Sequence, residues 1–149
     1  MKIYIAGPIS GKSKADVMQY WDEARRHFAD LGYEVFSPMT GKDHFRNDLP
    51  SEKFVSTGYK NPISTDHAIT HRDLWMVQNS DVIYVNLYKA ERVSIGCVSE
   101  LAWAKAFGKH AVVAMEDGGV HDHAFVRENA TIVFSNPDDA EKYLAALIR

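Results

Sequence analysis

The stretch that decides the fold is residues 81–115, DVIYVNLYKAERVSIGCVSELAWAKAFGKHAVVAM. Its first part, Asp81–Leu87, is rich in β-branched residues and predicts a buried strand. A helix is expected from about Val98 to Phe107, with Gly108 at its end, and His110–Met115 predicts another strand. Strands separated by a helix in this way favour a parallel sheet with helices packed on its faces.

The same alternation extends in both directions along the chain. Strands are predicted at residues 2–6, 33–36 and 131–134, and helices at residues 14–31, 66–78 and 137–148. The sequence therefore predicts an α/β fold of the doubly wound, Rossmann or flavodoxin-like type, with helices on both faces of a five-stranded parallel sheet. At 149 residues, the chain 1–149 is expected to form a single domain.

The net charge and the composition of the chain argue against some classes of partner and function. The net charge of −3 gives no overall basic surface, so nucleic acid is not the expected partner, although a small nucleotide needs only a local site. The single cysteine, Cys97, cannot form an internal disulfide, which suits the reducing cytoplasm. The sequence contains no signal peptide and no membrane-spanning run, so we expect a cytoplasmic protein without a membrane partner.

The segment 39–65 does not fit the alternation. It is long, polar and rich in turn residues, yet it contains Phe45, Phe54 and Tyr59. Connections of this length in a compact domain are usually functional or mobile. We expect an insert or lid that covers a site; the alternative is a surface excursion with a small apolar cluster of its own.

Ligands of open α/β sheets bind beyond the carboxyl ends of the strands. This rule selects three stretches, Gly7–Ser13, Leu87–Glu100 and Glu116–Arg127, which should meet at one edge of the sheet. The first stretch contains glycines, serines and Lys12, and it could present N–H groups and a cation to an anion. It matches neither a Walker A loop nor G-x-G-x-x-G, so an ordinary turn with Ser13 as N-cap is as good an interpretation.

Glu100 is the acidic residue at this edge that we consider as a candidate for catalysis. The expected helix places it in the first turn, where the helix dipole favours the ionised form. Cys97, three residues earlier, is a poor N-cap, which weakens the interpretation of Glu100 as part of a capping box. An ionised carboxylate at the edge could act as a nucleophile. Asp81 lies at the amino end of its strand, away from this edge, and is interpreted as structural. The position of Asp73 in the sequence does not by itself identify it as a site residue.

Four segments, taken in order, resemble the nucleoside 2-deoxyribosyltransferase family and the related deoxynucleoside 5′-monophosphate N-glycosidases. They are YIAGPISG (residues 4–11), HRDLWMVQNSDVIYVNL (71–87), SIGCVSELAWAKAFGK (94–109) and HAFVRENATIVF (123–134). The resemblance covers most of the chain apart from 39–65. The doubly wound sheet of that family agrees with the pattern of strands and helices.

The resemblance implies roles for particular residues. Glu100 corresponds to the nucleophile that forms a covalent deoxyribosyl–enzyme, and Asp73 to a group that moves a proton at the base. Tyr4 and the aromatic residues of 39–65 are candidates for stacking on the base. The late segment, residues 121–129, implies an oligomer, at least a dimer, in which it completes a neighbour's site. The residues expected to bind substrate are Tyr4, Gly7, Pro8, Ile9, Ser10, Lys12, Ser94, Gly96, His123 and Asn129.

The implied partners are a deoxynucleoside or deoxynucleotide and a free nucleobase. No cofactor or metal is implied. His67 and His71 are four residues apart on one helix face, and His121 and His123 are close together, but the sequence has neither an H-E-x-x-H motif nor a cysteine pair, so a zinc site is not expected.

Departures from the family pattern leave the substrate open. Cys97 stands where transferases usually have Thr, and His123 roughly where they have Asn. Ser94 matches the 5′-monophosphate glycosidases, but Ser10 stands where those have Arg, with Lys12 nearby. The sequence therefore leaves open a free nucleoside or a monophosphate, and transfer or hydrolysis. A nucleotide-binding module without chemistry, and a structural oligomer in which Glu100 only stabilises a helix, remain alternatives from other classes.

Overall fold

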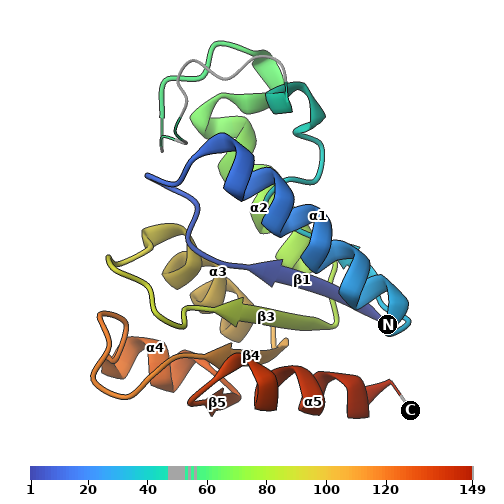
Figure 1. Cartoon of the computed structure of the whole chain (residues 1–149), viewed down its shortest axis with the longest axis vertical. Helices are drawn as coiled ribbons and strands as arrows, with labels where there is room; N and C mark the ends of the chain where they lie inside the picture. The colour runs from blue at the N-terminus through green and yellow to red at the C-terminus, as the bar shows by residue number, and fades with distance from the viewer. Residues whose placement is uncertain (47–52, 54, 56, 149) are drawn as a thin grey trace.

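The computed structural model describes residues 1–46, 53, 55 and 57–148, and its centre is a parallel five-stranded sheet (Figure 1). The strand order is β2-β1-β3-β4-β5, and every neighbouring pair is parallel. The strands are β1 (Lys2–Ala6), β2 (Glu34–Phe36), β3 (Val82–Asn86), β4 (His110–Ala114) and β5 (Ile132–Phe134). This order is that of flavodoxin-like folds, so the predicted fold class is confirmed.

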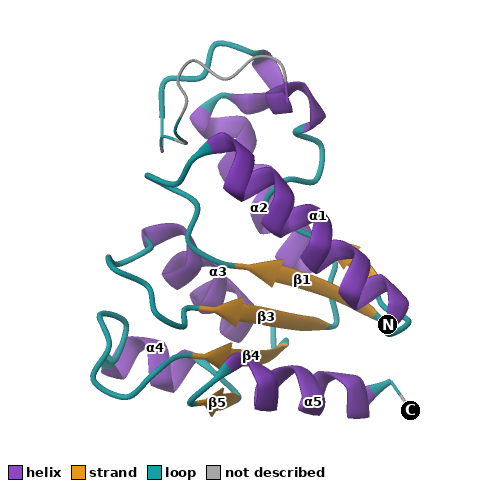
Figure 2. Ribbon diagram, in the orientation of Figure 1, coloured by secondary structure: helices purple, strands orange, loops and turns teal. Residues whose placement is uncertain are grey.

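The helices connect the strands and cover both faces of the sheet (Figure 2). They are α1 (Lys14–Asp30), α2 (Asp66–Gln78), α3 (Ile95–Ala106), α4 (Ala124–Asn129) and α5 (Pro137–Leu147). Short 3-10 helices, η1 (Asp43–Arg46) and η2 (Pro62–Ser64), lie in the segment 39–65. The sequence did not predict α4. No helix in the described part of the chain is long and apolar enough to cross a membrane.

Alternate residues of the strands pack into separate cores on the two faces, as the period of a strand requires. On one face α1 and α5 cover a core that includes Ile3, Ile5, Trp21, Phe28 and Leu144. On the other face α2, α3 and α4 cover a core that includes Tyr4, Ala6, Met76, Leu101 and Val126. Because both faces are covered, the inner strands β1, β3 and β4 are buried over most of their length, with a polar residue only at one end of each.

The carboxyl ends of β1 and β3 lie side by side, where the strand order reverses. The chain leaving β1 passes close to β3 at Gly7, where a Cβ atom would stand 3.2 Å from the carbonyl oxygen of Asn86. A glycine therefore allows this close approach. At the opposite edge, the backbone N–H of Lys2 donates to Asp81 Oδ2 at 2.7 Å. Asp81 therefore lies away from the carboxyl edge of the sheet, as the sequence predicted.

Candidate active site

A cavity of about 570 Å³ lies beyond the carboxyl ends of β1 and β3. Its walls come from the loop after β1 (Gly7–Ser10), from the start of α3 and the residues before it (Arg92–Gly96), from α2, and from the segment 39–65. Figure 1 shows that segment with α2 on one side of the end of β1, and α3 on the other. The cavity therefore lies where open α/β sheets bind ligands.

Glu100 lies in the second turn of α3, not in the first turn as the sequence suggested. Its side chain is 6% exposed and lines the cavity. The hydroxyl of Tyr4 donates to Glu100 Oε1 at 2.5 Å. Burial, together with the nearby charge of Asp73, raises the pKa of Glu100 to about 8, while the Tyr4 hydrogen bond and Lys42 oppose the rise. Burial therefore opposes the ionisation that the position of Glu100 in a first helical turn was expected to favour.

The earlier start of α3 has a local cause. Ser94 is the N-cap: its Oγ accepts from the backbone N–H of Cys97 at 3.4 Å. The backbone N–H of Ser94 in turn donates to Nε2 of His121 at 2.8 Å, and His121 is 2% exposed. The helix therefore begins at Ile95 rather than near Val98. Its N-cap is Ser94 and not Cys97, so the poor capping ability of Cys97 has no bearing on the role of Glu100.

Asp73 lines the same cavity from α2. Its Oδ1 atom is buried and has no hydrogen-bond partner among the residues that the structure describes. Burial raises the pKa of Asp73, and the positive charges of Lys42 and Arg72 oppose that rise. Two carboxyl groups whose pKa values lie above the ordinary range thus share one cavity, an arrangement typical of proton transfer and nucleophilic chemistry.

Most of the substrate-binding residues expected from the resemblance line the cavity: Gly7, Pro8, Ile9, Ser10, Ser94 and Gly96. Tyr4 and Lys12 are not among the described residues of its lining. Tyr4 is fully buried in β1, so it contacts Glu100 rather than stacking on a base as predicted. Lys12 is exposed, with its ammonium 6.0 Å from the centre of the Tyr20 ring.

The segment 39–65 contributes Met39, Lys42, Phe45, Val55 and Tyr59 to the cavity wall. The rings of Phe45 and Tyr59 are stacked, with centroids 4.8 Å apart. Phe54 lies outside the described residues, so its expected part in the site has no structural account. The described part of the segment forms a wall of the cavity; its movement as a lid stays a prediction.

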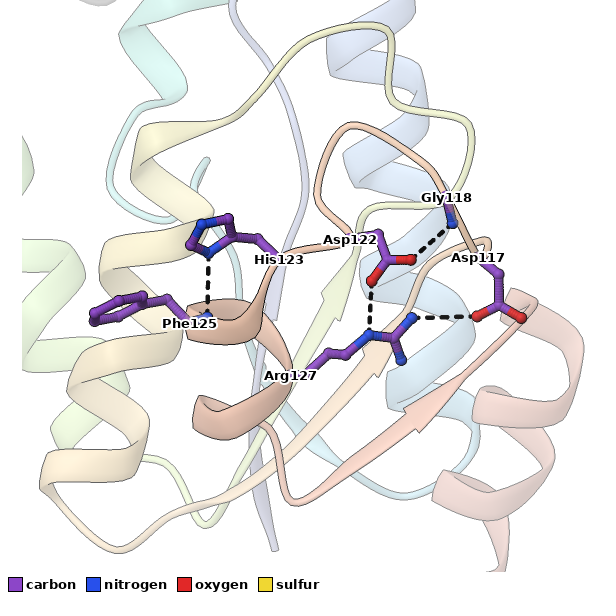
Figure 3. A network of polar contacts seen from close by, with 6 residues as sticks. All are labelled: Asp117, Gly118, Asp122, His123, Phe125 and Arg127. Carbon is purple, nitrogen blue, oxygen red and sulfur yellow. Dashed lines mark hydrogen bonds and ion pairs between the residues drawn. The ribbon is translucent and has the colours of Figure 1, made fainter.

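The late segment, residues 121–129, forms its own polar network (Figure 3). Arg127 donates from Nε to Asp122 Oδ1 at 2.6 Å and from Nη2 to Asp117 Oδ1 at 3.2 Å. Because these carboxylates occupy the guanidinium, Arg127 is poorly placed to bind a phosphate. His123 is the N-cap of α4, where its Nδ1 accepts from the backbone N–H of Phe125 at 3.2 Å.

Within one chain, the cavity's lining in the described residues does not include His123 or Asn129. Phe125 is 72% exposed, so its ring does not pack into the core of its own chain. The structure therefore leaves the Phe125 side chain at the surface, where another molecule could contact it, whereas His121 and Val126 of the same segment are buried.

Two basic residues of the cavity wall were missed as candidate site residues. Lys42 lies in the segment that had no predicted structure, so no pattern pointed to it. Arg92 lies in one of the three stretches expected at the carboxyl edge, and this position was the available signal. A Cβ atom at Gly11 would overlap the Arg92 guanidinium, so the side chain lies against the loop that follows β1.

Comparisons with known proteins agree with this geometry. A family model described as nucleoside 2-deoxyribosyltransferase matches residues 3–141. The chain is similar to a solved structure of a Clostridium botulinum CMP N-glycosidase, BcmB, with 14% identity, a TM-score of 0.56, and coverage of 99% of this chain and 97% of that one. No curated protein matches the sequence.

A second similar structure is a molybdenum cofactor binding protein from the phototrophic bacterium Rippkaea orientalis. Its identity is 16% and its TM-score 0.54, with coverage of 100% of this chain and 99% of that one. At such identities both solved structures support the fold alone.

Proposed function

Because the chain belongs to the nucleoside 2-deoxyribosyltransferase family, we propose that it cleaves the N-glycosidic bond of a 2′-deoxynucleoside and transfers the deoxyribose to another nucleobase. The observation that carries this proposal is the pair of carboxyl groups, Glu100 and Asp73, in one cavity at the carboxyl edge of the sheet. Retaining glycosyl chemistry needs one carboxylate to attack the sugar and a second group to move a proton.

In the first step a carboxylate oxygen of Glu100 attacks C1′ as the C1′–N bond breaks. Tyr4 engages Oε1, so Oε2 is the attacking atom. The electron pair of the broken bond passes to the base nitrogen, which takes a proton from the Asp73 carboxyl. The products are a free base, a deoxyribosyl ester of Glu100 and an ionised Asp73.

In the second step an incoming base replaces the first. Its N–H proton passes to Asp73, and its nitrogen bonds to C1′ as the ester bond breaks. Glu100 is released as a carboxylate, and Asp73 is again protonated. If water attacks instead, the proton of water goes to Asp73 and the product is free deoxyribose. The stacked rings of Phe45 and Tyr59 and the apolar wall around them favour a base over water.

A neighbouring subunit completes the site in this proposal. Phe125 and His123 stack with centroids 5.8 Å apart at the surface of α4, and Phe125 is a large exposed aromatic side chain. An apolar anchor among polar groups suits a subunit contact. His123 and Asn129 would then reach the sugar in the site of the other chain.

Hydrolysis of deoxynucleoside 5′-monophosphates is the second candidate, and Arg92 is the observation that favours it. Its guanidinium lies against Gly11, in the loop after β1, and its side chain lines the same cavity wall as Ser94. An arginine offers several donors that match phosphate oxygens. Ser10 stands where the monophosphate glycosidases have an arginine. Arg92, in the loop after β3, would then supply the positive charge in its place.

One experiment tests both candidates. The protein is incubated with deoxynucleosides and their 5′-monophosphates, with and without a second free base, and the products are separated by chromatography. Transfer yields a new nucleoside, hydrolysis yields free sugar or sugar phosphate, and intact-protein mass spectrometry detects a deoxyribosyl adduct. The Glu100→Ala variant should lose nearly all turnover while remaining folded.

Activity within about tenfold of wild type, equivalent to roughly 1.4 kcal/mol of barrier, would exclude Glu100 as nucleophile. Binding of a nucleotide without any product would instead indicate a binding module.

A further inference from the structure

Lys42 is a buried cation in the wall of the cavity. It lies between a turn, in which its N–H donates to the Met39 carbonyl at 3.0 Å, and η1, where its carbonyl accepts from Phe45 at 2.9 Å. Its side chain is 5% exposed and lines the cavity. Lysine is almost never this buried unless it is paired.

The ammonium group of Lys42 has no hydrogen-bond or ion-pair partner in the described part of the chain. Burial lowers its pKa, and the charges of Asp73 and Glu100 raise it, so these carboxylates lie within electrostatic reach but beyond ion-pair distance. A buried charge without hydrogen bonds is costly. Its three N–H donors are therefore available to a ligand in the cavity.

The neighbours of Lys42 indicate which part of a substrate it would meet. Phe45 and Tyr59 form a stacked pair in the same wall, suited to a planar ring. Asp73 is the group proposed to move a proton at the base. The loop after β1 and the start of α3, which line the cavity with Glu100, are left for the sugar. Lys42 therefore lies at the end of the cavity that takes the nucleobase.

We propose that Lys42 is the base-recognition residue of this site and that it selects nucleobases carrying an oxo group. An ammonium group only donates, so it pairs with an oxo oxygen and is left unpaired beside an exocyclic amine. As the C1′–N bond breaks, its electron pair delocalises over the departing base and onto that oxygen, where a nearby cation stabilises it. Adenine, which has no oxo group, should be the poorest of the common bases. This inference rests on the proposed function for the identity of the ligand.

The test uses hypoxanthine and adenine, which differ in the group at C6, an oxo group or an amine, and in the hydrogen that N1 carries only in hypoxanthine. Binding of each free base is measured by calorimetry, independently of turnover. Wild type should prefer hypoxanthine by about tenfold or more, because a charged donor left without its acceptor discriminates strongly. Lys42→Met, which keeps the length of the side chain without the charge, should abolish the preference. Lys42→Arg, which keeps the charge and the donors, should retain part of it.

Lys60→Met is the matched control, since Lys60 is an exposed lysine of the same segment, and it should keep the wild-type preference. Thermal melts establish that each variant is folded. Equal binding of the two bases by wild type, no binding of either, or a preference that survives in a folded Lys42→Met protein would overturn the inference. A preference that depends on Lys42 without any release of base from deoxyinosine would refute the proposed function and leave this inference standing.

Discussion

Tyr4 and Glu100 lie 96 positions apart in the chain and are joined by a buried hydrogen bond of 2.5 Å between the phenol and the carboxyl group. Tyr4 belongs to β1 and Glu100 to α3, so the bond links an inner strand of the sheet to the helix that lines the cavity. Donation from the phenol favours the ionised form of the carboxylate, against the burial that disfavours it. The pair thereby sets the pH at which Glu100 can attack.

Tyr4→Phe should move the pH dependence of activity upwards. The ionised Glu100 is the proposed nucleophile, so kcat/KM should rise with pH up to about 8 in wild type. Removing the phenol raises the pKa of Glu100 further, and the rising limb should shift by about one pH unit or more, because a hydrogen bond to a charged group contributes about 1.5–3 kcal/mol. The measurement is kcat/KM across pH 5 to 10.

Tyr84→Phe is the control for that shift. Tyr84 belongs to the neighbouring strand β3 but faces the opposite core. Its removal should leave the rising limb in place. A wild-type profile in Tyr4→Phe would show that the phenol does not govern the ionisation of Glu100.

Glu100→Gln should stabilise the protein most at alkaline pH. The pKa of Glu100 is raised from 4.5 to about 8 by folding, so wild type loses stability as pH rises from 4.5 to about 8, at about 1.4 kcal/mol per pH unit. Glutamine does not titrate. The difference in melting temperature, variant minus wild type, should therefore grow from pH 5 to pH 8 and then stay level, having increased by roughly 8 °C or more.

Glu116→Gln provides the comparison with opposite sign, because a backbone hydrogen bond from Lys89 lowers the pKa of Glu116. That variant should show no gain that grows with pH. A constant difference between Glu100→Gln and wild type across the pH range would contradict a raised pKa at Glu100.

Asp73→Asn should slow cleavage of the glycosidic bond much more than it weakens binding. General acid catalysis typically contributes about 10²–10⁴-fold, so kcat should fall by an amount in this range. A deoxynucleoside with a more acidic leaving base needs less protonation and should be partly rescued. Single-turnover kinetics with the two substrates measure this difference, and equal losses for both would assign Asp73 to another role.

Phe125→Glu should convert an oligomer into monomers. The charge would lie at the centre of the proposed contact. Sedimentation velocity would detect the loss of assembly, and an activity assay would detect the accompanying loss of turnover. Phe107→Lys is the control, at the C-cap of α3, where the exposed Phe107 should tolerate a positive charge. A wild-type protein that is fully active as a monomer would exclude a shared site.

Subunit exchange tests the same contact in another way. The Glu100→Ala and His123→Ala variants are each expected to be inactive. Mixed under exchange conditions, they should regain activity at sites that pair an intact Glu100 with an intact His123 from the other chain. Proven exchange without recovery would rule out the contribution of His123 to a neighbour's site.

Local patterns in the sequence were enough to predict which segments form strands and which form most of the helices. The run at 82–86 and the helical spacing at 66–78 depend on neighbours within a few residues, and both elements were predicted to within one residue. The doubly wound topology follows from that alternation, because a strand, helix and strand connect in a restricted way. The resemblance of short motifs was enough to select Glu100 and Asp73.

Tertiary structure decided what surrounds those two residues. The start of α3 depends on Ser94, and Ser94 is held by His121, which comes from beyond the next strand. Tyr4 was expected to stack on the base, and only the fold places its hydroxyl within hydrogen-bond distance of Glu100. Lys42 lies in a segment without periodicity, and only packing buries its charge beside two carboxyl groups. Burial and electrostatics depend on contacts between distant parts of the chain. The sequence alone therefore determined the scaffold and the candidate residues Glu100 and Asp73, and the tertiary structure decided the environment and the partners of these two residues.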